Sequence, residues 1–355
     1  MTKFFFTIGT SAELLKVFTV ASQLDAESFQ IVSTDQQSNL EELSLSLGMP
    51  APYSLHNGSA GSLTSLKGAL AWVASTVLLL SKFLRNRAST DKDWVVVHGD
   101  TITSTLCALV AKLKGYRIAH IEAGYRSGNL FRPFPEEIDR RITAYLADIH
   151  FAPTREAVQA LHKRRGVVVF TYGNTALDGV EYAQNHMSIA EKHPEPFGVV
   201  FIHRTELIGN RARLTSTIAE LLEASATVKF VFVLDPVTRH NLEKFGLLSS
   251  LEESSIQLED KLPFLEFHAL LAQAEFLITD SGGQQVEASA LGLPCLVVRR
   301  ETENIEPPGS SVVISRLQPR SIIEFVSSYK QKIRRRPETS QSPSKAIADY
   351  LRSLT

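Results

Sequence analysis

Short apolar runs alternate with longer amphipathic segments along almost the whole chain, and this alternation narrows the possible folds more than any other feature. Runs that are apolar on both faces and separated by helix-length segments are typical of parallel strands covered by helices. The clearest runs are residues 4–8, 94–97, 117–121, 167–170, 199–202, 229–234, 276–279 and 295–298. They form two sets, one before Phe170 and one after Gly198. The sequence therefore predicts an α/β protein with two Rossmann-like domains facing a cleft.

The length, charge and cysteine content of the chain exclude several classes of protein. The chain has 355 residues, of which 44% are hydrophobic, and this is enough for two domains with their own cores. With 37 Lys and Arg against 38 Asp and Glu, the net charge of −1 favours neither a nucleic-acid interface nor a polybasic membrane anchor. Cys107 and Cys295 are too few for a disulfide scaffold or a cysteine-based metal cluster. We expect a cytoplasmic protein without nucleic-acid partners.

No segment has the pattern of a leader or of a membrane span. The first residues run directly into the apolar run 4–8 without a signal-peptide pattern. The most apolar stretch, residues 68–80, is shorter than the roughly 20 residues that cross a bilayer. It is interrupted by Ser75 and Thr76 and flanked by Lys67 and Lys82. We therefore expect a buried helix there and no membrane insertion.

Three carboxylates are expected at or near strand ends of the first domain. Asp100 follows the run that begins at residue 94, Glu122 follows the run 117–121, and Glu136 lies in a proline-stiffened loop before a helix. The carboxyl ends of parallel strands lie at one edge of a sheet, so Asp100 and Glu122 should project over the same edge. Grouped carboxylates raise at least one pKa, which suits acid–base catalysis near neutral pH. Asp100 could instead cap a helix, because Thr101 and further helix-compatible residues follow it.

The strand expected at 4–8 is followed by a turn that is compatible with a phosphate group. Thr10 and Glu13 have the spacing of a capping box, which predicts that a helix starts at Thr10. The free N–H groups at that start could receive an anion, with Lys16 one turn further on. An ordinary strand–turn–helix without a ligand is the simpler interpretation of this segment.

The end of a second strand indicates a phosphate-binding site more strongly. Ser281, Gly282 and Gly283 follow the run 276–279 at the expected start of a helix. Two glycines there reduce helix propensity but allow a ligand to approach the backbone closely. Glu287, one turn later, is well placed to accept hydrogen bonds from a ribose diol. The glycine pattern is not the dinucleotide-binding one, so we expect no nicotinamide cofactor.

His203 and Arg204 end the run 199–202 of the second domain. We expect them to face the cleft opposite the carboxylates, where a cationic pair suits a diphosphate leaving group. The remaining histidines form no array with the spacing of metal ligands, so no metal site is predicted.

Several motifs together resemble the non-hydrolysing UDP-N-acetylglucosamine 2-epimerases, in order and in spacing. The motifs are HGDT at 98–101, HIEAGYRSG at 120–128, PFPEEIDR at 133–140, GNT at 173–175, HR at 203–204 and TDSGG at 279–283. The resemblance implies a GT-B-like pair of Rossmann domains, at 1–172 and 173–337. It further implies that the second domain binds UDP and that a last helix, within 338–355, crosses back to the first.

The resemblance also implies a reaction without cofactor or metal. A carboxylate removes the C2 proton of UDP-N-acetylglucosamine (UDP-GlcNAc) while UDP leaves C1, giving a 2-acetamidoglucal. UDP then adds back with protonation of the other face of C2, giving UDP-N-acetylmannosamine (UDP-ManNAc), a precursor of surface polysaccharide. Members of the family are commonly dimers, so we expect a homodimer.

The motifs and the resemblance together name the expected site residues. The catalytic residues are Asp100, Glu122, Glu136 and His203. The substrate-binding residues are Thr10, Lys16, Arg126, Arg204, Phe267, Ser281, Gly282, Gly283 and Glu287, with Phe267 beside the uracil. Which carboxylate serves each face of the sugar stays open.

The sequence departs from the family pattern at positions near the expected substrate. Ser11 and Asn304 stand where the family usually has arginines, and Leu262 stands where a glutamine often contacts the nucleotide. The segment linked to substrate activation in bacterial members is absent, and residues 33–37 occupy its region. We therefore predict no activation by substrate; a sigmoidal dependence of rate on UDP-GlcNAc would contradict this.

Three other functions fit parts of the pattern. A GT-B glycosyltransferase would keep the nucleotide half of the site and transfer the sugar to an acceptor, which Ser11 and Asn304 permit. A hydrolysing relative would release ManNAc and UDP, and a silent protein would only bind the nucleotide sugar. A transferase has no need for three carboxylates around C2, which favours the epimerase.

Overall fold

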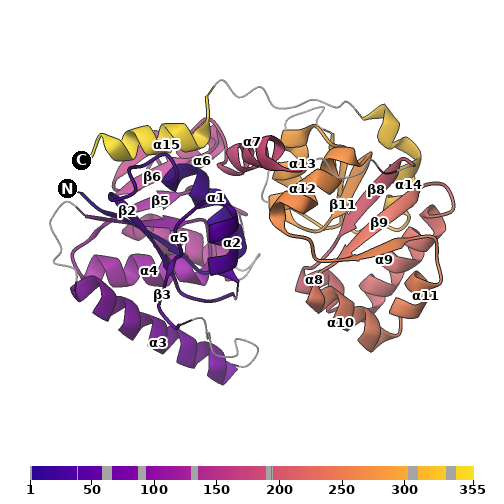
Figure 1. Ribbon diagram of the computed structural model, residues 1–355, viewed down its shortest axis with the longest axis horizontal. Coiled ribbons are helices and arrows are strands. Elements are labelled where there is room, and N and C mark those ends of the chain that lie inside the picture. The colour runs from indigo at the N-terminus through magenta and orange to yellow at the C-terminus, as the bar shows by residue number, and fades with distance from the viewer. Residues whose placement is uncertain are drawn as a thin grey trace. The chain divides into compact units, whose positions relative to one another are not determined.

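The computed structural model describes residues 2–37, 39–57, 66–86, 93–128, 135–188, 193, 195–302, 311–332 and 341–355. The chain forms two compact units, one of Met1–Gly179 with Thr339–Thr355 and the other of Val180–Glu338. Each unit contains one parallel sheet covered by helices (Figure 1). The predicted α/β class with two Rossmann-like domains is confirmed.

The first unit is built on a seven-stranded parallel sheet with the strand order β3-β2-β1-β4-β5-β6-β7. The strands are β1 (Phe4–Ile8), β2 (Phe29–Ser33), β3 (Tyr53–Ser54), β4 (Trp94–His98), β5 (Arg117–Ile121), β6 (Ile149–Ala152) and β7 (Val167–Phe170). The strand order reverses between β1 and β4, which pair directly. In open parallel sheets ligands bind beyond the carboxyl ends of the strands at such a reversal.

Helices cover both faces of this sheet. They are α1 (Ser11–Ala21), α2 (Leu40–Ser46), α3 (Leu66–Arg85), α4 (Ile102–Leu113), α5 (Glu136–Leu146), α6 (Arg155–Leu161), the start of α7 (Ala176–His186) and α15 (Pro343–Arg352). Helix α1 packs against α2 and α15, whereas α4 packs against α3 and α5. The core under α3 and α4 includes Phe5, Val95 and Val97 of neighbouring strands.

The two units divide inside α7, at Gly179, and not at the boundary expected between 172 and 173. The first turn of α7 belongs to the first unit because it contacts both α1 and α15. A Cβ added to Gly179 would lie 3.4 Å from the carbonyl oxygen of Leu15. The Asp178 carboxylate accepts the N–H of Ser344 at the start of α15, at 2.7 Å. Helix α15 is thereby held to the first unit.

Helix α3 corrects the expectation of a short buried helix at 68–80. It runs over 20 residues, Leu66–Arg85. Judged by length and composition, its segment Lys67–Arg85, of 19 residues, is long and apolar enough to cross a membrane. One side of α3 packs in the core of the first unit through Leu80, Phe83 and Leu84. Its opposite side exposes Leu70 and Leu78, which are 62% and 71% exposed. The apolar stretch is therefore buried along one side only, and 28% of it is buried within the structure.

The second unit is built on a six-stranded parallel sheet with the order β10-β9-β8-β11-β12-β13. The strands are β8 (Phe197–Phe201), β9 (Lys229–Leu234), β10 (Gln257–Asp260), β11 (Phe276–Thr279), β12 (Cys295–Val297) and β13 (Val312–Ile314). The order reverses between β8 and β11, so the residues that follow these two strands are the ones placed to meet a ligand.

The helices of the second unit also form two layers (Figure 1). They are α8 (Thr205–Ile208), α9 (Arg211–Ala224), α10 (Pro236–Phe245), α11 (Leu248–Glu252), α12 (Phe264–Gln273), α13 (Gly282–Leu291), α14 (Ser321–Ser328) and the 3-10 turn η1 (Tyr329–Gln331). One core joins α9, α10 and α14 to one face of the sheet. The other core joins α12 and α13 to the opposite face, through Phe267, Leu271 and Ala288.

Candidate active site

Glu122 lies directly after β5, where a lysine and a histidine hold its carboxylate. Its Oε2 atom is 2.7 Å from Nζ of Lys16 in α1 and 2.9 Å from Nε2 of His98, the last residue of β4. Burial alone would raise the pKa of Glu122, but the charge of Lys16 and the contact with His98 outweigh burial and hold the pKa well below its usual range. The carboxylate is therefore ionised at neutral pH, as a proton acceptor must be.

The ends of β4 and β5 are joined directly before Asp100 and Glu122. The N–H of Gly99 donates to the carbonyl of Ile121 at 2.9 Å. Glu122 itself has a positive φ of 61°, in the left-handed region that favours glycine. Such a backbone costs of order 1 kcal/mol and is found at functional sites more often than elsewhere. The two carboxylates therefore follow paired strand ends, as the sequence predicted.

Asp100 is paired with a buried arginine of α5. Its Oδ2 atom is 2.5 Å from Nη2 of Arg140, whose side chain is 6% exposed. Thr101, and not Asp100, caps α4, because the Thr101 hydroxyl accepts the N–H of Ser104 at 3.1 Å. The interpretation of Asp100 as a helix cap is therefore wrong. Its carboxylate, which is 30% exposed, lies beside the charge of Arg140.

Helix α5 begins at Glu136, which is half-buried. The next residue, Glu137, is fully buried and fixes the start of the helix. Its carboxylate accepts Nε of Arg141 at 2.9 Å and the N–H of Ser127 at 3.0 Å, and it lies 3.6 Å from Nη1 of Arg140. Glu137 thus supports the arginine that pairs with Asp100. Residues 129–134, which include much of the expected proline loop, lie outside the described part of the chain.

Arg126 lies on the same side of the first unit as Glu137. It is half-buried, and its Nη1 atom donates to the carbonyl of Tyr125 at 2.6 Å. Burial lowers the pKa of Arg126, and the charge of Glu137 opposes that effect. Its role in binding a substrate stays a prediction.

Asp139, one turn after Glu136, should make the stability of the first unit depend on pH. Burial raises the pKa of Asp139 to about 6, and the charges of Asp100 and Glu136 add to the effect. A raised pKa in the folded state gives stability that is complete below about pH 4 and is lost as the pH rises through about 6. Asp139→Asn should therefore stabilise the first unit at pH 8 by ~2 kcal/mol, and not at pH 4.

Urea unfolding followed by tryptophan fluorescence measures this effect, because both tryptophans, Trp72 and Trp94, are buried in the first unit. Asp25→Asn is a matched control, since Asp25 is on the same unit and exposed. Equal gains at pH 4 and pH 8 would contradict the assignment to Asp139.

The start of α1 is capped by its own chain. Thr10 caps the helix and forms the predicted capping box with Glu13, which is confirmed. Glu13 Oε2 accepts the N–H groups of Gly9 and Thr10, both at 2.9 Å, and Gln37 Oε1 accepts the N–H of Ser11 at 2.9 Å. These donors are therefore occupied within the chain, and the interpretation as an ordinary strand–turn–helix is the better one. A substrate contact of Thr10 stays a prediction.

In the second unit, Asp280 holds the turn that carries His203 and Arg204. Asp280 is fully buried after β11, and its two oxygens accept the N–H groups of His203 and Arg204, each at 2.9 Å. This ties the ends of β8 and β11 together at the reversal of the strand order. Burial lowers the pKa of His203, although the charge of Asp280 opposes it. His203 is therefore mainly neutral at pH 7.

Helix α13 begins at Gly282 with Ser281 as its cap, as predicted. The Ser281 hydroxyl accepts the N–H of Gln284 at 3.5 Å. A Cβ added to Gly283 would meet only Ser281 Oγ, at an ordinary 3.8 Å, and the φ of Gly283 is not positive. Nothing in the described chain thus requires glycine at this position, which suggests room for a ligand.

Phe267 of α12 is only 8% exposed and packs against Phe201, with 5.5 Å between ring centroids. Glu287 lies in the second turn of α13 with a side chain that is 20% exposed. Both belong to the layer of α12 and α13, as does the turn of Ser281, Gly282 and Gly283. Their contacts with uracil and ribose stay predictions.

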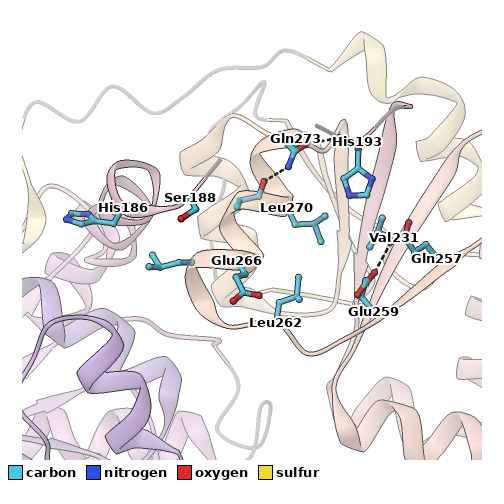
Figure 2. A pocket seen from close by; sticks show the side chains of 12 residues that line it. His186, Ser188, His193, Val231, Gln257, Glu259, Leu262, Glu266, Leu270 and Gln273 are labelled. Carbon is cyan, nitrogen blue, oxygen red and sulfur yellow. Dashed lines mark hydrogen bonds between the residues drawn. The ribbon is translucent and has the colours of Figure 1, made fainter. Parts of the chain in front are cut away.

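A cavity of about 440 Å³ lies beside α12 in the second unit (Figure 2). Its lining includes Leu262, Glu266 and Leu270, together with Val231 of β9 and Glu259 of β10. Of the positions discussed above only Leu262 lines this cavity, and none of the expected catalytic or substrate-binding residues does. The cavity is thus separate from the turn formed by Ser281 and the two glycines.

Sequence reasoning did not assign site roles to four residues that the structure places against the expected ones. They are His98 and Arg140 in the first unit, and His268 and Asp280 in the second. His98 and Asp280 stand inside the motifs HGDT and TDSGG, so their motifs could have identified them. Arg140 stands inside the motif PFPEEIDR, so that motif could likewise have identified it. His268 carries no local signal, because its partner Glu287 is distant in sequence.

Comparisons with known proteins agree with the motifs. Residues 28–352 match a family model described as UDP-N-acetylglucosamine 2-epimerase. A UDP-N-acetylglucosamine 2-epimerase of Methanococcus maripaludis is 32% identical over 343 residues, covering 90% of this chain and 89% of the relative. A UDP-2,3-diacetamido-2,3-dideoxy-D-glucuronate 2-epimerase of Pseudomonas aeruginosa is 33% identical over 315 residues, covering 84% of both.

A solved structure supports the same conclusion. The UDP-GlcNAc 2-epimerase of Methanocaldococcus jannaschii in complex with UDP-GlcNAc and UDP matches all of this chain and all of its own, with a TM-score of 0.85 and 27% identity. The family resemblance deduced from the motifs is confirmed. This chain belongs to the UDP-N-acetylglucosamine 2-epimerase family.

Proposed function

We propose that the chain is a non-hydrolysing UDP-GlcNAc 2-epimerase, which interconverts UDP-GlcNAc and UDP-ManNAc by elimination and re-addition of UDP. The observation that carries the proposal is the ionised Glu122 carboxylate, held by Lys16 and His98 at the strand-order reversal of the first unit. Asp100 follows the neighbouring strand, and Glu136 begins the helix that supplies its arginine. Family membership favours this function over the glycosyltransferase considered from the sequence.

The reaction needs a base on one face of C2 and an acid on the other. In the elimination, the C2–H electrons form the C1–C2 double bond, the C1–O bond breaks, and UDP carries the electron pair away. Glu122 is assigned as the base because Lys16 and His98 fix its carboxylate at the strand end, and Asp100 and Glu136 are the candidates for the opposite face. In the re-addition, a proton returns to C2 and a UDP oxygen bonds to C1, so no oxidant, reductant or metal takes part.

The second unit suits the UDP half of the substrate. His203 and Arg204 place a neutral imidazole and a cation after β8, and the N-terminus of α13 offers backbone donors beside the two glycines. We assign the diphosphate to Arg204, Ser281, Gly282 and Gly283, the ribose to Glu287 and the uracil to Phe267. Neutral His203 can accept a proton and, once protonated, can donate it to the leaving UDP oxygen.

Incubation of the purified protein with UDP-GlcNAc in D2O, followed by NMR, tests this function. An epimerase incorporates deuterium at C2 and forms UDP-ManNAc without any acceptor. Free ManNAc with UDP would instead identify a hydrolase, and unchanged UDP-GlcNAc would contradict epimerisation of this sugar. Because of the Pseudomonas aeruginosa relative, the same assay with a UDP-2,3-diacetamido-2,3-dideoxyglucuronate would then test the second candidate substrate.

Gly283→Ala should change stability and binding in opposite directions. The added methyl group has no close neighbour in the described chain, and alanine favours a helix over glycine by up to about 1 kcal/mol. The thermal midpoint should therefore stay the same or rise slightly. The methyl group would intrude on a phosphate at the helix N-terminus, so the Kd for UDP should rise about tenfold or more. Calorimetry with UDP measures the Kd. An unchanged Kd would show that the diphosphate does not bind at this turn.

We also propose that the protein is a homodimer. Helices α3, α4 and α5 pack side by side and expose the apolar residues Leu70, Leu78, Leu113, Ile142 and Tyr145. Exposed large apolar side chains on three neighbouring helices would suit a protein–protein contact. Sedimentation velocity should give the mass of two chains, and a single chain at micromolar concentration would contradict the proposal.

The proposed setting of the enzyme is the cytoplasm, where it would supply UDP-ManNAc for a surface polysaccharide. Both cysteines, Cys107 and Cys295, are free and buried, as is common in reducing compartments. Loss of the corresponding polysaccharide on deletion of the coding sequence tests this role.

A further inference from the structure

We infer that His268 is a positioning residue for ribose recognition: it orients the Glu287 carboxylate toward the two ribose hydroxyls. The inference deepens the proposed function and rests on it, because it takes Glu287 as the ribose contact. His268 touches no expected substrate group itself, and it acts through Glu287.

The position of Glu287 on α13 fits a ribose contact. Gly283 and Glu287 are four residues apart, so they lie on the same side of the helix. A diphosphate at the N-terminus of α13 would place the attached ribose about one helical turn, or ~5.4 Å, further along the axis. The Glu287 side chain is 20% exposed, so part of it is accessible from solvent.

His268 supports this carboxylate from the buried side. It lies on α12, directly after Phe267, and its side chain is 1% exposed. Its Nε2 atom is 3.5 Å from Oε2 of Glu287, which is just longer than a good hydrogen bond. A small shift of the carboxylate toward His268 brings the two atoms into hydrogen-bond range.

Packing alone does not explain a histidine at this position. Neither ring nitrogen of His268 has a hydrogen-bond partner among the described residues. Burying such polar atoms is unfavourable, and an apolar side chain would pack as well against Phe264, whose ring lies 4.6 Å away edge to face. The nearest group that can use an imidazole nitrogen is the Glu287 carboxylate. Within the described part of the chain, the Nε2 atom therefore has a use toward Glu287.

The protonation state of His268 suits a donor. Burial lowers the pKa of His268 to about 4, so the ring is neutral at pH 7 and carries one N–H. With the proton on Nε2 it donates to Glu287 without adding a buried charge. His268 then fixes the orientation of the carboxylate that is assigned to the ribose hydroxyls.

The test compares UDP-GlcNAc with its 2′-deoxyuridine analogue in wild type and in His268→Phe. Phenylalanine keeps the ring and removes the nitrogens. The KM for UDP-GlcNAc should rise about tenfold with kcat unchanged, because the ribose contact is the same in the ground and transition states. The KM for the deoxy analogue should change less than twofold, since Glu287 has already lost one of its partners there. A fall in kcat alone, or equal losses for both substrates, would overturn the inference.

Two further variants keep the test decisive if His268→Phe folds poorly. His268→Gln can place an amide N–H near the position of Nε2 and should restore most of the discrimination between ribose and deoxyribose. In a Glu287→Ala background, His268→Leu, which removes both ring nitrogens, and wild-type His268 should bind UDP equally. Calorimetry with UDP and 2′-deoxy-UDP measures the discrimination and the background effect without turnover. Retained discrimination in His268→Phe, or an effect of His268 that persists without Glu287, would show a packing role only.

The result that would contradict the proposed function differs from the result that would contradict the role of His268. If the wild type neither binds UDP nor exchanges the C2 proton, the epimerase assignment fails and His268 is not at issue. If the wild type does both and His268→Phe behaves as wild type on both substrates, only the present inference is wrong.

Discussion

Replacing Glu122 with glutamine should lower the rate of C2 proton exchange by about 10²–10⁴-fold, the usual contribution of a positioned general base. Glutamine has almost the same shape but cannot accept the proton. Its amide also faces Lys16 and His98, which pair with the carboxylate at 2.7 and 2.9 Å in the native protein. Deuterium incorporation from D2O, followed by NMR, measures the loss directly.

The control for Glu122→Gln separates chemistry from folding and binding. Glu42→Gln makes the same change on an exposed position of α2 in the same unit and should leave exchange unaffected. The Kd of Glu122→Gln for UDP should stay within a few-fold of wild type, because UDP is assigned to the second unit. Normal exchange in both Glu122→Gln and Asp100→Asn would show that the base has been misassigned.

Replacing Glu13 with glutamine should destabilise the first unit by about 3–5 kcal/mol, because several buried donors share this one carboxylate. The Glu13 side chain is buried, and its Oε2 atom accepts the N–H groups of Gly9 and Thr10. Its Oε1 atom accepts the hydroxyls of Thr101 and Ser104, at 2.6 and 3.2 Å. An amide has one acceptor oxygen, so its NH₂ group would face donors of the native turn.

The effect of Glu13→Gln reaches the site because these bonds join the starts of α1 and α4. Helix α1 carries Lys16, and α4 starts directly after Asp100. Urea unfolding followed by the fluorescence of Trp72 and Trp94 reports the first unit, and Glu42→Gln is again the matched control. A loss below about 1 kcal/mol would mean that water replaces the carboxylate without penalty.

Much of the fold follows from local patterns in the sequence. Runs such as 117–121 and 229–234 match β5 and β9 because buried parallel strands are apolar on both faces. The capping box of Thr10 and Glu13 is equally local, since both bonds join residues within one helical turn. The length of α3 was underestimated, because Lys82 and Arg85 interrupt the apolar run but lie on the solvent side of a continuing helix.

The candidate site was predictable only in part. Strand ends placed Asp100, Glu122, His203 and Ser281 at the edges where ligands bind, because parallel strands end at one side of a sheet. The sequence suggested an anion site at the start of α1, but its first N–H groups are taken by Glu13 and by Gln37. Gln37 lies far along the chain from this helix start, and no pattern within α1 reveals such a partner.

The sequence alone determined the class of the fold, the strand ends that carry functional groups, and the family. These depend on periodicity and on residues close together in the chain, which act before any tertiary contact forms. The tertiary structure alone decided the ionisation of Glu122, the pairing of Asp100 with Arg140 and the support of Glu287 by His268. Charge and burial depend on which side chains meet across distant elements, so these properties exist only in the folded chain.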